Sequence, residues 1–230
     1  KAIEIDPSFS QAYTNLGLIL QELNNTVEAE FFLRKAIELN PNFSVAHNNL
    51  GVLFKVQSKL DQAAKSFRKA IQLDKKYALA YSNLGGVLQN QGELDLAKGT
   101  ILEAIEIDQN ISDAHYNLGT IYRDLNDLNL SIKSFKKALE IDKVNIKTIT
   151  ELIYTLSMQS DWNQVQKYLP SLNNSDLNDL AIDPFKLLHI EDNPEYHLIR
   201  AKNFFNEHFK RQSIPLNYKQ KEKIHVGYFS

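Results

Sequence analysis

Ala80-Tyr81-Ser82-Asn83-Leu84-Gly85 is one of four stretches of this sequence in which an alanine stands four residues before a Leu-Gly pair. The pairs lie at Leu16-Gly17, Leu50-Gly51, Leu84-Gly85 and Leu118-Gly119, so that each is 34 residues after the last. The same step relates two series of alanines, namely Ala12, Ala46, Ala80 and Ala114, and Ala36, Ala70, Ala104 and Ala138. Self-similarity at a fixed period of this length is typical of a repeat protein whose units stack on one another.

Each unit is predicted to contain two antiparallel helices. In the first unit the apolar spacing predicts helices over Ser10–Glu22 and Thr26–Leu39. The turns between helices are marked by Asn24, Ser58, Gly92 and Asn126. Three of these four are Gly or Asn, which readily adopt the left-handed conformation that closes a helix. Glycine and alanine at the periodic positions allow the helices to approach closely.

The details of the repeat resemble a known family. An aromatic residue or a histidine stands three residues before each leucine, at Tyr13, His47, Tyr81 and His115, and Ala63 and Phe67 are four residues apart. These residues resemble the tetratricopeptide repeat. The resemblance implies an all-α fold, a right-handed superhelix of antiparallel helix pairs. We expect the array at 1–145, with a partial helix and four units starting at residues 10, 44, 78 and 112, and an atypical closing helix pair at 146–169.

An asparagine recurs in the first helix of each unit, and it is the main candidate for binding. The four residues are Asn15, Asn49, Asn83 and Asn117. Because a side-chain amide offers donors and an acceptor together, a ladder of amides on the concave face can hold an extended peptide by its backbone. The alternative is that these asparagines are inherited by duplication of the unit and do not bind.

Two cations, Lys55 and Arg123, are predicted to lie beside this asparagine ladder. With Gln21 and Gln89 they would give the concave face a mixed polar character. We include both cations in the candidate peptide-binding face, although long charged side chains often only mark a solvated face. Glu151 stands where the ladder would take its fifth step, and it should interrupt the groove there.

Composition argues against several other functions. With 26 Lys and Arg against 28 Asp and Glu the net charge is −2, which does not favour nucleic acid or a membrane surface as a partner. There is no cysteine, and the six histidines lack paired metal-ligand spacing. No catalytic motif occurs, so we expect no catalytic residue, metal or cofactor in this chain. We expect a cytoplasmic location.

The last quarter of the chain changes character. Residues 170–223 are predicted to be a linker with one helix, which Asp192 or Asn193 would cap and along which Leu198, Ala201, Phe205 and Phe209 form an apolar face. Residues 224–230 read as a buried strand, which we interpret as the truncated start of an α/β domain.

Three segments together resemble the protein O-linked N-acetylglucosamine transferase and SPINDLY family. They are Asp161-Trp162, then Pro184-Phe185 with Leu187, Leu188, Asp192 and Pro194, and finally Val226-Gly227-Tyr228 with Ser230. The resemblance implies a parent enzyme that transfers a sugar from UDP-N-acetylglucosamine or GDP-fucose to Ser or Thr of proteins. It also implies that the asparagine ladder holds the acceptor polypeptide, and that the catalytic residues lie beyond Ser230.

Two other interpretations stay open at this point. One is a non-enzymatic scaffold for protein–protein interaction, because generic repeats explain every residue up to about Asn145. The other is a surface for self-association. All three interpretations predict protein or extended peptide segments as partners.

Overall fold

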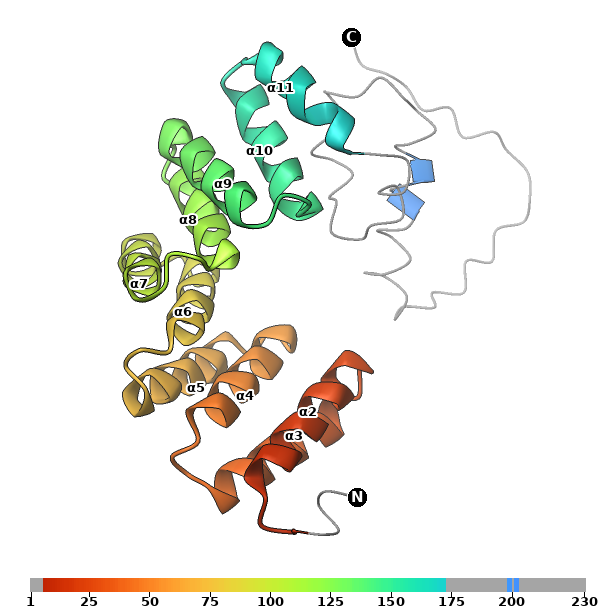
Figure 1. Cartoon of the computed structure of the whole chain (residues 1–230), viewed down its shortest axis with the longest axis vertical. Helices are drawn as coiled ribbons and strands as arrows, with labels where there is room; N and C mark the ends of the chain where they lie inside the picture. Colours follow the sequence, from red (N-terminus) through yellow and green to blue (C-terminus); the bar gives the residue numbers. More distant parts are fainter. Residues whose placement is uncertain (1–5, 173–197, 200, 203–230) are drawn as a thin grey trace, which may run out of the picture. The chain divides into compact units, whose positions relative to one another are not determined.

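The structure is a computed structural model that describes residues 6–172 together with residues 198, 199, 201 and 202. Residues 6–172 form five consecutive pairs of helices, which follow one another along the array in Figure 1. The pairs are α2 (Ser10–Glu22) with α3 (Thr26–Leu39), α4 (Ser44–Val56) with α5 (Leu60–Leu73), α6 (Ala78–Asn90) with α7 (Leu94–Ile107), α8 (Ser112–Asp124) with α9 (Leu128–Ile141), and α10 (Ile146–Met158) with α11 (Trp162–Tyr168). A short 3-10 helix, η1 (Leu169–Ser171), follows.

We call the first helix of each pair the A helix and the second the B helix. The predicted bounds of the first pair agree with α2 and α3, and the next three A helices begin at residues 44, 78 and 112. The predicted turn residues Asn24, Ser58, Gly92 and Asn126 all have positive φ, between 59° and 81°. A fifth residue of this kind, Ser160 (φ 59°), lies between α10 and α11. The closing pair therefore repeats the turn of the regular units.

Within a unit, the glycine of the Leu-Gly pair sets the distance between the two helices. A methyl group at Gly85 would lie 2.4 Å from Ile101 Cδ1, and one at Gly51 would lie 2.6 Å from Phe67 Cε1. Gly17 meets Leu33 and Gly119 meets Phe135 in the same way. Because real Cβ contacts are not this short, only glycine allows the A and B helices to pack at this separation.

Between units, each pair covers an apolar face of the next. Leu53, Val87 and Ile121 occupy the same place in three successive A helices and have no exposed surface, and they join one continuous apolar core. Ile19 has the same place in α2 but is 53% exposed, since no described residue packs on that side of α2. Stacking, rather than the individual unit, therefore buries this series of side chains.

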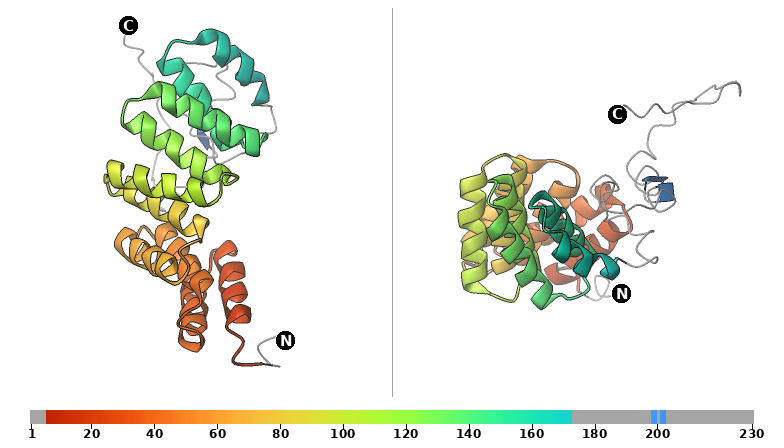
Figure 2. Two further views of the ribbon diagram at one scale, coloured as in Figure 1. Left: turned by 60° about the vertical axis from the view of Figure 1, so that its left-hand side comes forward. Right: turned by 90° about the horizontal axis from the view of Figure 1, so that it is seen from above.

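Neighbouring units touch through the A helix of the second unit, which contacts both helices of the unit before it. Each B helix packs on the A helix that follows, and A helices of successive units also contact each other, as α6 and α8 do. B helices of successive units make no comparable contact within the described array. Closer stacking along the A helices curves the array with these helices on its inner side, and the two further views in Figure 2 show the same succession of pairs. The predicted all-helical repeat array is confirmed for the described residues.

The remaining C-terminal predictions lie largely outside the described residues. The residues following the array group as a separate unit, 174–230, from which Leu198, Ile199, Ala201 and Lys202 are described as helical. The rest of the predicted linker at 170–223 beyond residue 172, and the predicted strand at 224–230, are not among the residues described.

Candidate binding face of the A helices

The four ladder asparagines occupy equivalent places on α2, α4, α6 and α8, but their surroundings differ. Asn15 is exposed, Asn49 is only 8% exposed, and Asn83 and Asn117 are half-buried. The structure therefore brings the predicted ladder onto one inner face, with its members seated at different depths.

Asn83 and Asn117 each bridge to the preceding unit. The Asn83 amide nitrogen donates to Asn48 Oδ1 at 3.1 Å, and that of Asn117 donates to the carbonyl oxygen and hydroxyl of Ser82 at 3.4 and 3.3 Å. Asn48 and Ser82 directly precede the ladder asparagines of their own units. These bonds fix both amide planes. No described residue donates to the Oδ1 atom of either asparagine.

The first two ladder residues lack this bridge. Asn15 Oδ1 accepts from Gln11 of its own helix at 3.0 Å. Asn49 Oδ1 accepts from Asn48 at 3.3 Å, while its Nδ2 is buried and has no hydrogen-bond partner in the described part of the chain. In the preceding unit, Thr14 occupies the bridging place, but its hydroxyl donates to the backbone of Ser10.

A second contact between units also recurs along the inner face. Near the end of each A helix, Gln21, Lys55, Gln89 and Arg123 occupy equivalent places, and each is paired with one place in the following A helix. Gln89 Oε1 accepts from Thr120 at 3.1 Å, the guanidinium of Arg123 lies 5.7 Å from the centre of the Tyr154 ring, and Lys55 approaches Gly86. Gln21 would meet Val52 there, and Gln21 Oε1 is buried without a described partner.

Arg123, a predicted site residue, is engaged by Glu151. The two side chains form a hydrogen-bonded ion pair and are 16% and 8% exposed, respectively. Glu151 is therefore more than an interruption of the ladder, because it supplies the counter-ion for Arg123 and ties α10 to α8. Sequence reasoning did not find this pair. The signal was available, since a carboxylate replaces asparagine 28 residues after an arginine that faces the next unit.

Lys55 is in a different situation. It is half-buried on α4, and it forms no ion pair with any residue of the described array. Burial lowers the pKa of the Lys55 ammonium, with a further lowering from Lys147 and an opposing effect from Asp113. Burial, with smaller effects from Glu151 and Asp113, also raises the pKa of the nearby Tyr116, so this phenol stays protonated at neutral pH.

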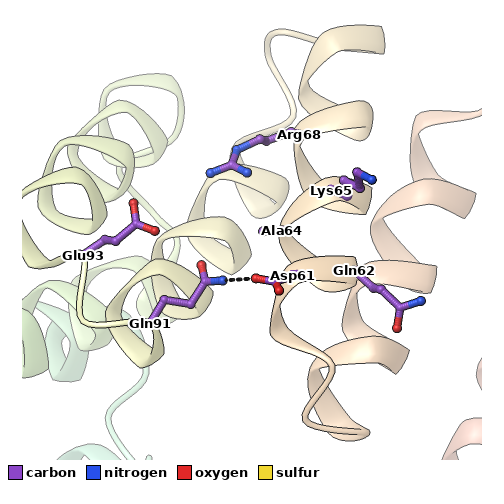
Figure 3. Close-up of a pocket in the computed structure, with 7 residues that line it drawn as sticks. All are labelled: Asp61, Gln62, Ala64, Lys65, Arg68, Gln91 and Glu93. Atoms are coloured by element: carbon purple, nitrogen blue, oxygen red, sulfur yellow. Dashed lines mark hydrogen bonds between the residues drawn. The ribbon is translucent and has the colours of Figure 1, made fainter.

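Outside the inner face the described residues offer less. Figure 3 shows a pocket of about 310 Å³ between α5 and the α6–α7 turn, where Gln91 donates to Asp61 at 2.8 Å beside Lys65, Arg68 and Glu93. Its charges are mixed, and none of its side chains is an unpaired buried group. Within the described residues no cluster of His, Asp and Glu could hold a metal ion. None of the described helices has the length and apolar character needed to cross a bilayer.

The histidines at the repeat's aromatic place have structural contacts. His47 Nε2 is 3.0 Å from the carbonyl oxygen of Pro41, and His115 Nε2 is 3.0 Å from that of Gln109. Each ring thus joins the start of an A helix to the connection before it.

Residues 10–143 define a solenoid of stacked helix pairs with an inner polar face. Tetratricopeptide repeat models match residues 10–43, 32–65, 78–111 and 112–143, and a TPR repeat model matches residues 53–92. The chain therefore belongs to the tetratricopeptide-repeat family. Among curated proteins, no sequence matches this chain.

Several solved structures share the fold. PilF of Pseudomonas aeruginosa is 23% identical, with a TM-score of 0.67 over 90% of this chain and 94% of that one. YrrB, described as a TPR protein with an unusual peptide-binding site, is 21% identical, with a TM-score of 0.56 over 88% of this chain and 96% of that one. The Cut9–Hcn1 hetero-tetramer of the APC/C has a TM-score of 0.74 at 20% identity, over 88% of this chain and 41% of that one.

Proposed function

We propose that the inner face of the A helices binds an extended peptide segment of a partner protein, and that Asn49, Asn83 and Asn117 hold its backbone. The observation that carries this proposal is the fixed orientation of Asn83 and Asn117. Each amide nitrogen is used in a bond to the preceding unit, while each Oδ1 remains available to accept from a peptide N–H. The peptide-binding site described for YrrB is consistent with this use of the fold.

The spacing of the units suits an extended chain. Packed helices lie about 8–10 Å apart, and an extended chain advances about 3.3 Å per residue. Successive ladder asparagines would therefore contact peptide residues that are about three positions apart. Asn49 Nδ2 is buried, so it can donate to a peptide carbonyl only after the side chain rotates.

Peptide binding by ladder variants tests the proposal. Blocked 12-residue peptides selected against the full chain would be titrated by fluorescence anisotropy with Asn83→Ala, Asn117→Ala and the double variant. We expect about fivefold weaker binding for each single change, the equivalent of about one hydrogen bond. Asn110→Ala is the matched control, because Asn110 lies in the exposed connection before α8. Unchanged affinity in the double variant would exclude the ladder.

A more specific role is recruitment of acceptor polypeptides to a nucleotide-sugar-dependent protein O-glycosyltransferase, with UDP-N-acetylglucosamine or GDP-fucose as donor. The support is the order of the three sequence segments given above, of which only Asp161-Trp162 is described. There Asp161 caps α11, accepting from the Gln164 backbone nitrogen at 3.2 Å. The alternative is a non-enzymatic scaffold. Reading the parent coding sequence past Ser230 distinguishes the transferase role from the scaffold. The transferase role requires a pair of α/β nucleotide-sugar domains there, and an early stop codon would exclude it.

A further inference from the structure

Three successive A helices bring two nitrogen donors together over one glycine. A Cβ atom placed on Gly86 of α6 would lie 3.5 Å from Lys55 Nζ, which comes from α4, and 3.7 Å from Asn117 Nδ2, which comes from α8. The equivalent residues of the other described units are Leu18, Val52, Thr120 and Tyr154, so among these units only α6 lacks a side chain at this place, where a lysine and an amide approach the helix.

The charge around these donors is positive. Lys147 and Asp113 are the charged groups that act on Lys55, and the Lys147 ammonium lies 4.3 Å from the centre of the Tyr116 ring. The other nearby charges, Arg123 and Glu151, neutralise each other. Two lysines against one aspartate leave an excess of one positive charge. Burial and Lys147 lower the pKa of Lys55, and Asp113 opposes this lowering only in part.

We propose that Lys55 Nζ, which lies over Gly86, binds the side-chain carboxylate of an Asp or Glu within the peptide held by the asparagine ladder; Asn117 Nδ2 lies beside this position but already donates to Ser82. The inference rests on the proposed function and adds the chemical class of one bound residue. A carboxylate at the Lys55 ammonium would form a charge-assisted hydrogen bond, which is about twice as strong as a neutral one.

The position of the pair favours an internal side chain over a peptide C-terminus. Lys55 Nζ lies over Gly86 of α6, and ladder residues stand on the helices to either side, Asn49 on α4 and Asn117 on α8. A peptide that uses all of them continues past Lys55 in both directions. The acidic residue should therefore lie in the middle of the bound segment.

The test uses the full chain and the tightest blocked 12-residue peptide selected against it. Each Asp or Glu of the peptide is changed singly to Asn or Gln, and each peptide is titrated against wild type, Lys55→Met and Lys65→Met. Lys65→Met makes the same charge change on the outer helix α5. We expect one acidic residue whose replacement weakens binding at least tenfold to wild type and to Lys65→Met, but less than twofold to Lys55→Met.

A second variant separates geometry from charge. Gly86→Leu keeps both lysines and introduces the residue that the first unit carries at this place, Leu18. The leucine side chain would fill the space between α6 and the ends of the Lys55 and Asn117 side chains. We therefore expect the same loss of the preference for an acidic peptide residue. Circular dichroism establishes that each variant is folded.

The outcomes distinguish the two proposals. Selection of peptides that bind independently of Asn83 and Asn117 would overturn the proposed function. Peptides that need the ladder but contain no acidic residue coupled to Lys55 would overturn only the carboxylate site. A third outcome would also overturn the carboxylate site: a peptide with a free C-terminal carboxylate binds, its amidated form does not, and replacing the internal Asp or Glu residues has no effect.

Discussion

The first and third junctions between units have the same apolar framework but different polar contacts. At the third, where α6 and α7 meet α8 and α9, Asn117 bonds to Ser82, and Gln89 bonds to both Thr120 and Asp124. At the first, where α2 and α3 meet α4 and α5, three buried amide atoms have no partner among the described residues: Gln21 Oε1, Asn49 Nδ2 and Gln57 Oε1.

The difference shows that glycine and the apolar residues build the fold while single residues of the neighbouring unit decide the polar pairing. Gln91 and Gln159 occupy the same place as Gln57, and they donate to Asp61 and Asn129 of the unit before. The residue in that place before Gln57 is Val27. Val27 can neither accept from the Gln57 amide nitrogen nor donate to its oxygen, and Gln57 Oε1 is buried without a described partner.

The largest effect is expected at the fourth junction, where the polar contact is an ion pair. Arg123→Met would break this ion pair, in which both side chains are largely buried, and we expect a loss of about 3 kcal/mol in the free energy of unfolding. Arg34→Met is the control, because the Arg34–Glu30 pair is exposed and should contribute less than about 1 kcal/mol. Urea denaturation of both variants measures the difference, and equal losses would contradict this account.

Contacts within a unit should be the next most sensitive, and they should not depend on the junction. Gly85→Ala would place a methyl group 2.4 Å from Ile101 Cδ1, so we expect a loss of about 1–3 kcal/mol from overpacking. Gly99→Ala in α7 meets no atom within 4 Å and should instead stabilise the protein by about 0.5–1 kcal/mol. If both changes shift the midpoint of thermal unfolding in one direction, the close approach is not what requires glycine.

The first junction should be open to repair. Val27→Asn introduces at a 79% exposed site the residue that pairs with Gln159 in the last junction. Because asparagine both donates and accepts, it can satisfy Gln57, and we expect a gain of about 0.5–1.5 kcal/mol. A double-mutant cycle with Gln57→Leu checks the cause, since the gain should disappear when the amide is removed.

The smallest expected effect concerns Lys55. Since burial lowers its pKa in the folded state, the charged form opposes folding at neutral pH, and Lys55→Met should raise the free energy of unfolding by up to about 1 kcal/mol. The part of this stability gain that comes from removing the charge has its full size at pH values below the pKa of Lys55 in the folded protein. It should fade as the pH rises through the folded pKa to the ordinary value of lysine, 10.5. Thermal unfolding across that range measures it, and a pH-independent gain would point to packing.

Much of the array could be predicted from the sequence, because each unit carries its own evidence. The Leu-Gly pairs and the turn residues gave the helix pairs, and the step of 34 residues applied once more leads from Asn126 to Ser160. The polar contacts could not be predicted in this way. They join residues 28 to 35 apart in different units, as Asn83 and Asn48 or Arg123 and Glu151 do, and each depends on which residue the neighbour supplies.

The convergence of Lys55 and Asn117 was also beyond sequence reasoning. Both were candidate residues, but Gly86 belongs to no repeated pattern, and the other four units carry four different side chains at the equivalent place. Only the structure shows that this glycine lets residues from two other units meet. The peptide-binding role of the ladder stays a prediction until it is measured.

Because the polar contacts form between neighbouring units, the inner surface depends on the order in which the units follow one another. Excision of residues 78–111, one complete repeat, would preserve the helix-pair period but join α4 and α5 directly to α8 and α9. Lys55 would then meet Thr120 instead of Gly86, and Asn117 would meet Asn48 instead of Ser82. The recombined chain would keep its fold and every remaining residue, yet present a different surface. The inner surface of this solenoid thus depends on which repeats are neighbours. Duplication, deletion or shuffling of whole repeats can therefore change that surface without a single point mutation.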